Sequence, residues 1–345
     1  MKPSKLVWFL FLSVFSALLF AEAPGYHIIK TVKLGGEGGW DYLTADSAAR
    51  RLYISSGSHV MVVGMDNYEV IADLQDMQGV HGVALAKELN RGFTSNGKTN
   101  DVSIFDLKTF MMLGRVKAGE NPDAILYDTA SKKVFAFNGK SNDVTAFDAA
   151  TGEVRGTIKV GGKPEFPAAD GAGKIYVNIE DTNEVAELDS NKLELTRRFL
   201  LKPGEEPTGM ALDRRHGRVF SACHNKLLVA LEADSGKFLG TIDIGAGVDG
   251  AAFDPETGFI FASNGEGTLT VAKELVQGEF AALETVPTKK GARTMAIDEK
   301  THNVFLVSAD LEPAPAAKEG EKPQRPKPIP GSFVLIVMGP QRTED

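Results

Sequence analysis

The sequence predicts an all-β protein, a seven-bladed β-propeller with four antiparallel strands in each blade. Three observations lead to this fold: a unit of four short strands, its recurrence with a period of just over forty residues, and an unpaired strand-like segment near the start of the chain. Repeats of this length with four strands each are typical of propeller blades. Helical solenoids have a similar period, but Val-, Ile- and Phe-rich runs separated by Gly and Asn turns favour strands.

The clearest unit is the segment 121–162. It contains four strand-like runs, at Ala124–Tyr127, Val134–Phe137, Val144–Phe147 and Arg155–Val160. An acidic turn follows the first run, an Asn-Gly turn follows the second, and a Thr-Gly turn follows the third. Because turns of this chemistry connect neighbouring strands, the unit predicts one up-and-down antiparallel sheet.

Seven copies of the unit keep the same phase. The acidic turn recurs every 41 to 44 residues, with Lys87 in its place in the second copy, at Asp46, Asp128, Asp170, Asp213, Asp254 and Asp298. An aromatic residue follows six or seven positions later in every copy, at Tyr53, Phe93, Phe135, Tyr176, Phe220, Phe261 and Phe305. Seven copies therefore predict seven blades.

The seventh copy is one strand short, with strand-like runs only at 292–298, 303–308 and 333–339. The missing strand is available at the start of the chain, where the extended run Tyr26–Leu34 precedes the first copy. We expect this N-terminal strand to complete the last blade, which would close the ring and cover sheet edges that otherwise invite aggregation. Residues 311–331, within this blade, are rich in Pro, Lys and Glu and predict a disordered insertion.

Residues 1–23 have the pattern of a secretory signal peptide. Lys2 and Lys5 precede an apolar run of 15 residues, Leu6–Phe20, which ends in small residues. A membrane-spanning helix needs about 20 apolar residues, so we expect no membrane span after cleavage. The mature chain, 24–345, is expected to be a single propeller domain, monomeric, and either periplasmic or secreted.

The composition argues against nucleic acids and anionic membranes as partners. The formal net charge is −8, and removal of Lys2 and Lys5 with the signal peptide lowers it to −10. Neutralisation of phosphates by basic side chains supplies most non-specific affinity for nucleic acids. The chain has one cysteine, Cys223, so no intramolecular disulfide is available and stability must come from the hydrophobic core.

The second and third runs of three copies resemble the YVTN-type repeat, in which aromatic-Val-x-Asn is followed by Asn-x-Val and a terminal Asp. The matching segments are GFTSNGKTNDVSIFD (92–106), VFAFNGKSNDVTAFD (134–148) and IYVNIEDTNEVAELD (175–189). The first, fifth, sixth and seventh copies depart from the pattern. Residues 26–340 are similar in order to the YncE-like family of exported seven-bladed propellers. The resemblance implies a periplasmic or secreted propeller, with single-stranded DNA binding associated with one member, and it carries over no catalytic residues.

One face of such a propeller collects the segments that lead into the innermost strands and the hairpins that join the second and third strands. Both sets surround the mouth of the central channel. The candidate ligand-binding residues in the first set are Trp40, Asp41, His81, Asp123, Glu165, Glu206, Asp249 and Arg293. The hairpins add His59, Cys223 and His224, whereas hairpin geometry explains Asn96, Asn138, Asn178 and Asn264.

The sequence establishes no cofactor, and a divalent cation is the candidate at this face because carboxylate and imidazole ligands converge there. The candidate metal ligands are Asp123, Glu165, Glu206, Asp249 and His81. Cys223 and His224 would also suit zinc or copper, but adjacent residues of a strand point to opposite faces. We therefore interpret Cys223 as a buried core residue beside a hydrogen-bonded histidine.

Three functions of different classes fit these features. The first is a binding or scaffold module of the cell envelope, which takes a protein or small-molecule partner at the channel-mouth face. The alternative is a metal-assisted hydrolase or lyase, or a dehydrogenase-associated enzyme, with the cation at the channel mouth; no catalytic residue is identified, so binding is preferred. Single-stranded DNA binding follows from the resemblance alone. It would need a basic stripe, whereas this face is acidic or neutral except for Arg293.

Overall fold

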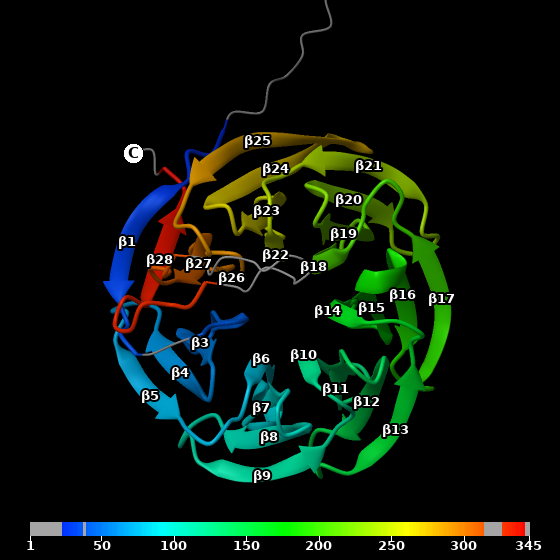
Figure 1. The fold of residues 1–345 in the computed structure, drawn as a ribbon. Helices are drawn as coiled ribbons and strands as arrows, with labels where there is room; N and C mark the ends of the chain where they lie inside the picture. Colours follow the sequence, from blue (N-terminus) through cyan, green and yellow to red (C-terminus); the bar gives the residue numbers. More distant parts are fainter. Residues whose placement is uncertain (1–22, 37–38, 314–325, 342–345) are drawn as a thin grey trace, which may run out of the picture.

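The computed structural model describes residues 23–36, 39–313 and 326–341. It shows seven four-stranded antiparallel sheets arranged as a ring around a central channel (Figure 1). The sequence prediction of a seven-bladed β-propeller is therefore confirmed. Each blade runs from an innermost strand at the channel to an outermost strand at the rim.

The strands of successive blades occupy four equivalent positions. The innermost strands are β2 (Leu43–Asp46), β6 (Val80–Ala86), β10 (Pro122–Asp128), β14 (Pro164–Ala169), β18 (Pro207–Asp213), β22 (Val248–Phe253) and β26 (Met295–Asp298). The second strands are β3 (Arg51–Ser56), β7 (Arg91–Asn96), β11 (Lys133–Asn138), β15 (Lys174–Ile179), β19 (Arg218–Cys223), β23 (Phe259–Asn264) and β27 (Asn303–Ser308). The third strands are β4 (His59–Gly64), β8 (Asp101–Asp106), β12 (Asp143–Asp148), β16 (Glu184–Asp189), β20 (Leu227–Glu232), β24 (Thr268–Val276) and β28 (Val334–Gly339). The outermost strands are β5 (Val70–Leu74), β9 (Met112–Lys117), β13 (Val154–Lys159), β17 (Glu194–Leu200), β21 (Phe238–Asp243), β25 (Glu279–Pro287) and β1 (His27–Lys33).

The N-terminal strand completes the last blade. Strand β1 pairs antiparallel with β28, from His27 opposite Gly339 to Lys33 opposite Val334. The strand is anchored by Tyr26, which is 4% exposed, packs edge-on against Phe261 and donates a hydrogen bond from its hydroxyl to the carbonyl of His302. The first and last strands of the described chain thus lie side by side in one blade (Figure 1).

The hydrophobic core consists of clusters between and within neighbouring blades. The recurring aromatic residue of every second strand is buried, with at most 1% of its surface exposed. Tyr53 and Phe93 show how these rings join blades, because they pack against Phe105 and Phe147 of the following blade at centroid distances of 6.0 and 5.8 Å. The phase of the aromatic residues in the sequence therefore reflects one packing position repeated seven times.

The acidic turns are structural. Asp128, for example, is buried and accepts a hydrogen bond from the backbone N–H of Ser131. The alignment of Lys87 with these acids was wrong, because β6 places Ala86 at the equivalent position, opposite Arg91. Lys87 begins the 3₁₀ turn η1 (Lys87–Leu89) instead, and its ammonium group pairs with Asp46 of the preceding blade at 2.8 Å.

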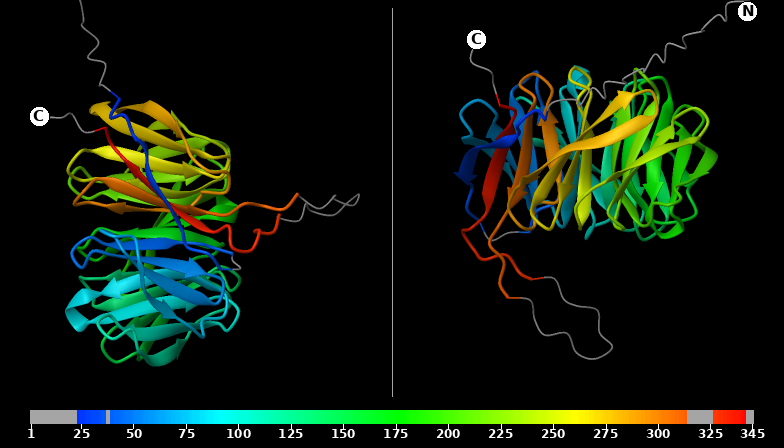
Figure 2. Two further views of the ribbon diagram at one scale, coloured as in Figure 1. Left: turned by 90° about the vertical axis from the view of Figure 1, so that its left-hand side faces the viewer. Right: turned by 90° about the horizontal axis from the view of Figure 1, so that it is seen from above.

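The two faces of the ring differ in what they carry. The start of β1 and the end of β28 lie at one face, whereas the described parts of the connection from β27 to β28, residues 309–313 and 326–333, project from the other (Figure 2). Of the insertion predicted at 311–331, residues 314–325 lie outside the described residues, and Leu311 forms an isolated bridge with Pro328. The predicted signal peptide, except for Ala23, also lies outside them.

Candidate ligand-binding cavity at the channel mouth

A cavity of about 700 Å³ opens at the mouth of the channel, on the face from which the β27–β28 connection projects. Every blade contributes to it a residue that stands at or just before the start of its innermost strand. These seven residues are Asp41, His81, Asp123, Glu165, Thr208, Asp249 and Arg293. The cavity falls within the size range of about 300–1,000 Å³ that is usual for small-molecule sites.

A local irregularity of the sheet directs these side chains to the channel. In five blades the pairing of the innermost strand with its neighbour shifts register where the cavity residue stands: Val80/Val83, Pro122/Ile125, Pro164/Pro167, Pro207/Met210 and Val248/Gly250. A bulge adds a residue to one strand and re-aims its side chain. In these five blades the bulges therefore re-aim one polar residue to the channel.

Hydrogen bonds between blades fix the backbone of the cavity residues. The hydroxyl of Thr294 donates to the carbonyl of Asp41 at 2.6 Å, and that of Ser263 donates to the carbonyl of Arg293 at 2.6 Å. The hydroxyl of Ser95 donates in the same way to the carbonyl of Asp123. Because each bond joins neighbouring blades, the cavity side chains start from a rigid frame.

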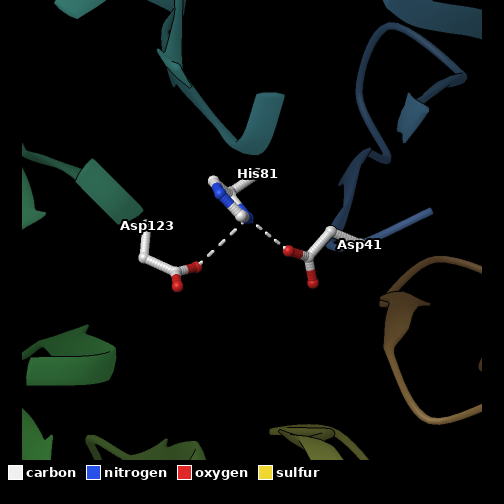
Figure 3. Close-up of side chains that lie close together, drawn as sticks. All are labelled: Asp41, His81 and Asp123. Atoms are coloured by element: carbon white, nitrogen blue, oxygen red, sulfur yellow. Dashed lines mark hydrogen bonds and ion pairs between the residues drawn. The ribbon is translucent and has the colours of Figure 1, made fainter. Parts of the chain in front are cut away.

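One cluster within the cavity joins three blades at His81. Its ring nitrogen Nδ1 donates to Oδ2 of Asp41 at 2.6 Å and lies 3.6 Å from Oδ1 of Asp123. Figure 3 shows both carboxylates approaching the same ring nitrogen from opposite sides. Burial alone would lower the pKa of His81, but the bond to Asp41 and the charges of both carboxylates raise it to about 9.

A second cluster contains the arginine. The Nε atom of Arg293 donates to Oδ2 of Asp249 at 2.8 Å, and its terminal nitrogen lies 4.0 Å from Oδ1 of Asp41. Burial raises the pKa of Asp249 above its ordinary value despite the arginine, and the charge of Asp41 adds to the effect. Asp41 thus links the histidine cluster to the arginine cluster.

A third cluster surrounds Lys163. Its ammonium group pairs with Oε1 of Glu165 at 2.6 Å and with Glu180, which stands in the 3₁₀ turn η2 (Glu180–Thr182). Burial and the charge of Asp123 raise the pKa of Glu165 to about 9, and burial likewise raises that of Asp123 to about 6. The single positive charge of Lys163 therefore does not neutralise the carboxyl groups of Glu165, Glu180 and Asp123 on this side of the cavity.

Two aromatic residues, Trp40 and Tyr42, line the cavity. Tyr42 and Trp40 are 7% and 8% exposed. The indole Nε1 of Trp40 is buried without a hydrogen-bond partner among the described residues. The ring of Tyr42 reaches from the first blade to Phe166 of the fourth, with ring centroids 5.1 Å apart. Tyr42 therefore crosses the channel and forms part of the cavity wall.

Most of the residues expected at the channel mouth line this cavity: Trp40, Asp41, His81, Asp123, Glu165, His224, Asp249 and Arg293. Three expected residues do not. His59 pairs with Asp73 at 3.2 Å, and Glu206 is an exposed residue that pairs with His224 at 3.3 Å. Cys223 is fully buried in the core, where burial raises the pKa of its thiol to about 12.

Thr208 takes the position that had been assigned to Glu206. It stands five residues before Asp213, as Asp123 stands five residues before Asp128, so counting from the acidic turn would have found it. Lys163, Glu180 and Tyr42 were also missed, and only their side-chain directions bring them into the cavity. All four asparagines assigned to hairpins are buried, and three bond within their own hairpin, as Asn138 does by donating to Asp143 and Thr145. The assignment was wrong for Asn178, which donates instead to the carbonyls of Thr208 and Gly209 in the next blade.

A second cavity, of about 630 Å³, lies beside the paired chain ends. Its lining includes His27 and Asn303, and His27 is the one ionisable side chain among the described residues that line it. This cavity therefore offers no cluster of ionisable groups. The chemistry concentrates at the channel mouth.

The fold and the cavity define the class of the protein: it is a seven-bladed β-propeller, a fold that suggests a binding or scaffold module. Among the described residues, no helix has the length and apolar character needed to cross a membrane. Searches against protein-family models and curated proteins find no match to the chain.

Proposed function

We propose that this protein is an exported binding module of the cell envelope, related to the YncE-like propellers, whose channel-mouth cavity binds a small polar ligand with a positively charged group. One observation carries the proposal: all seven blades send one residue into a single cavity of ligand size. Rigid strands that present varied side chains around a channel provide the preorganisation that binding requires.

The charge of the cavity supports a cationic group. Among the described residues, its lining holds five carboxyl groups, at Asp41, Asp123, Glu165, Glu180 and Asp249, against Lys163, Arg293 and the imidazole of His81, whose pKa of about 9 keeps it protonated at neutral pH. The raised pKa values of Asp123, Glu165 and Asp249 have the same physical origin, since buried carboxylates that crowd one another resist ionisation. A bound ammonium or guanidinium group would relieve this repulsion, and Arg293 would remain available to an anionic group of the same ligand.

Thermal unfolding tests the proposal in the presence of a chelator. A panel of amines, amino acids and polyamines should include compounds that raise the midpoint, whereas inorganic phosphate and a single-stranded oligothymidine should not. Substituting Glu165→Gln together with Asp249→Asn should abolish the shift. A matched pair on the opposite face, Glu256→Gln with Asp66→Asn, should preserve it.

Three results would contradict the proposal. The first is the absence of any stabilising cationic compound, and the second is an equal shift in the cavity variant and the control. The third is tight binding of the oligonucleotide at physiological salt, which would favour the DNA-binding alternative over the charge argument.

Export is part of the same proposal, and the signal-peptide pattern of Met1–Ala23 supports it. We expect the mature chain to start near Glu22 or Pro24. Intact-mass analysis of exported protein checks this expectation. A mature species that retains Met1–Phe20 would show that the segment is an anchor.

The metal-assisted enzyme is retained as a second candidate because of the cluster formed by Asp41, His81 and Asp123. Their ligand atoms lie within 4.8 Å of one another. Catalysis would require a metal at this cluster together with a general acid or base, for which Glu165 offers a pKa of about 9. Hydrolysis of a substrate, or its cleavage by elimination, would support this candidate if the reaction required added metal.

A further inference from the structure

We infer that Asp41, His81 and Asp123 form a binding site for a divalent transition-metal ion, Zn²⁺ or Mn²⁺. The inference goes beyond the binding of an organic ligand, because it concerns these three side chains and holds whether or not such a ligand exists. The donor set of one imidazole nitrogen and two carboxylate oxygens suits these ions.

The spacing of the donor atoms fits a shared ion. Three ligands on a tetrahedron with metal–ligand distances of about 2.1 Å lie about 3.4 Å apart. Nδ1 of His81 lies 3.6 Å from Oδ1 of Asp123 and 2.6 Å from Oδ2 of Asp41. The third separation, between the carboxylate oxygens of Asp41 and Asp123, is within 4.8 Å. Side-chain movements on the order of 1 Å would therefore bring the three donors to the spacing that a shared ion needs.

The orientation of the His81 ring is fixed by the backbone of Gly97, which packs against its Nε2 side. A Cβ atom at Gly97, in the hairpin between β7 and β8, would lie 2.7 Å from Nε2 of His81, so the ring packs against bare backbone on that side. The opposite ring nitrogen, Nδ1, consequently faces the two carboxylates (Figure 3). Each donor comes from a different blade, so ring closure rather than local sequence brings them together.

One buried polar atom of the same cavity lacks a protein partner. The indole Nε1 of Trp40, a side chain that is 8% exposed and lines the cavity next in sequence to Asp41, forms no hydrogen bond with the described residues. Buried polar groups normally have a partner, so this atom is consistent with a ligand or water oxygen in the cavity. Three protein donors would leave coordination positions of the ion open for such an oxygen.

A second histidine cluster shows what a purely structural arrangement looks like. On the opposite face, His302 contacts Asp254 through Nδ1 at 2.7 Å and Glu256 through Nε2 at 3.7 Å. Its two carboxylates stand at different ring nitrogens, so they cannot share one ion with the imidazole. His81 differs because both carboxylates converge on one nitrogen.

Calorimetric titration of chelator-stripped protein with ZnCl₂ and MnCl₂ tests the inference, without any organic ligand. We expect saturable binding of one ion per chain, confirmed by elemental analysis after dialysis. The substitutions His81→Asn and Asp123→Asn should each weaken binding more than about 100-fold, since altering even an outer-shell partner costs 10- to 100-fold. Gly97→Ala, which removes no donor but displaces the ring, should weaken it by about 10- to 100-fold.

The matched control is His302→Asn, which should bind metal as the unsubstituted protein does. Circular dichroism and urea unfolding of every variant establish that the propeller is intact. The inference is overturned if the unsubstituted protein shows no saturable binding of Zn²⁺ or Mn²⁺, or if His81→Asn binds these ions as tightly as the unsubstituted protein does. Tighter binding of Ca²⁺ and Mg²⁺ than of Zn²⁺ and Mn²⁺ would also overturn it. Because this titration uses no organic ligand, and the thermal-shift panel is run with chelator, the two proposals can fail independently.

Discussion

Replacement of His81 by asparagine should make the stability of the metal-free protein depend differently on pH. The folded state raises the pKa of His81 from 6.5 to about 9, through the hydrogen bond to Asp41 and the charges of Asp41 and Asp123, which outweigh burial. A group whose pKa is higher in the folded state stabilises it fully below its unfolded pKa. That contribution is then lost as the pH rises through the folded value.

The size of the effect follows from the same shift. Each unit of difference between the folded and unfolded pKa values, about 9 and 6.5, corresponds to about 1.4 kcal/mol. The protonated His81 therefore stabilises the fold by about 3 kcal/mol at pH 6. The His81→Asn protein should therefore be less stable by about this amount at pH 6. The difference in the free energy of unfolding should shrink steadily between pH 6.5 and 9.

Urea unfolding at pH 6, 7, 8, 9 and 9.5, with a chelator present, measures this difference. His59→Asn serves as the control, because His59 lies outside the cavity and surface substitutions usually change stability by within about 0.5 kcal/mol. We expect the difference in the free energy of unfolding between His81→Asn and the unsubstituted protein to shrink over this range. If that difference stays constant or grows from pH 6 to 9.5, the electrostatic account of the cluster is refuted.

Three further predictions concern the fold. Tyr26→Ala should lower the free energy of unfolding in urea by about 3–5 kcal/mol and Tyr26→Phe by only about 1 kcal/mol, since the buried ring anchors β1; equal losses would assign the anchoring to the hydroxyl. Gly92→Ala should cost about 1–3 kcal/mol, because an added Cβ would lie 2.1 Å from Cζ of Phe105; an unchanged thermal midpoint would contradict this packing. Cys223, whose pKa burial raises to about 12, should resist iodoacetamide at pH 8 in the native state and react in urea, as followed by mass spectrometry; equal labelling rates would show that the thiol is accessible.

The local features of the fold could be predicted because their determinants lie close together in the sequence. The acidic turns act within three residues, as the bond from the Ser131 N–H to Asp128 shows. The alternation of apolar residues and the Asn-containing hairpins are equally local, and their sevenfold recurrence predicts the number of blades. Even the pairing of β1 with β28 was suggested by counting, since the seventh copy has one strand too few.

The full set of residues that line the cavity could not be predicted from this local information. The sequence by itself determined the propeller, the number of its blades and the face on which most cavity residues stand. The tertiary structure decided which side chains meet: register shifts turn Thr208 inward, Glu206 remains exposed, and Tyr42 crosses the channel to Phe166. The physical reason is that Asp41, His81 and Asp123 come from three blades and are adjacent only because the ring closes around a narrow channel. Distances between blades are set by packing of the whole ring, which no repeat encodes alone.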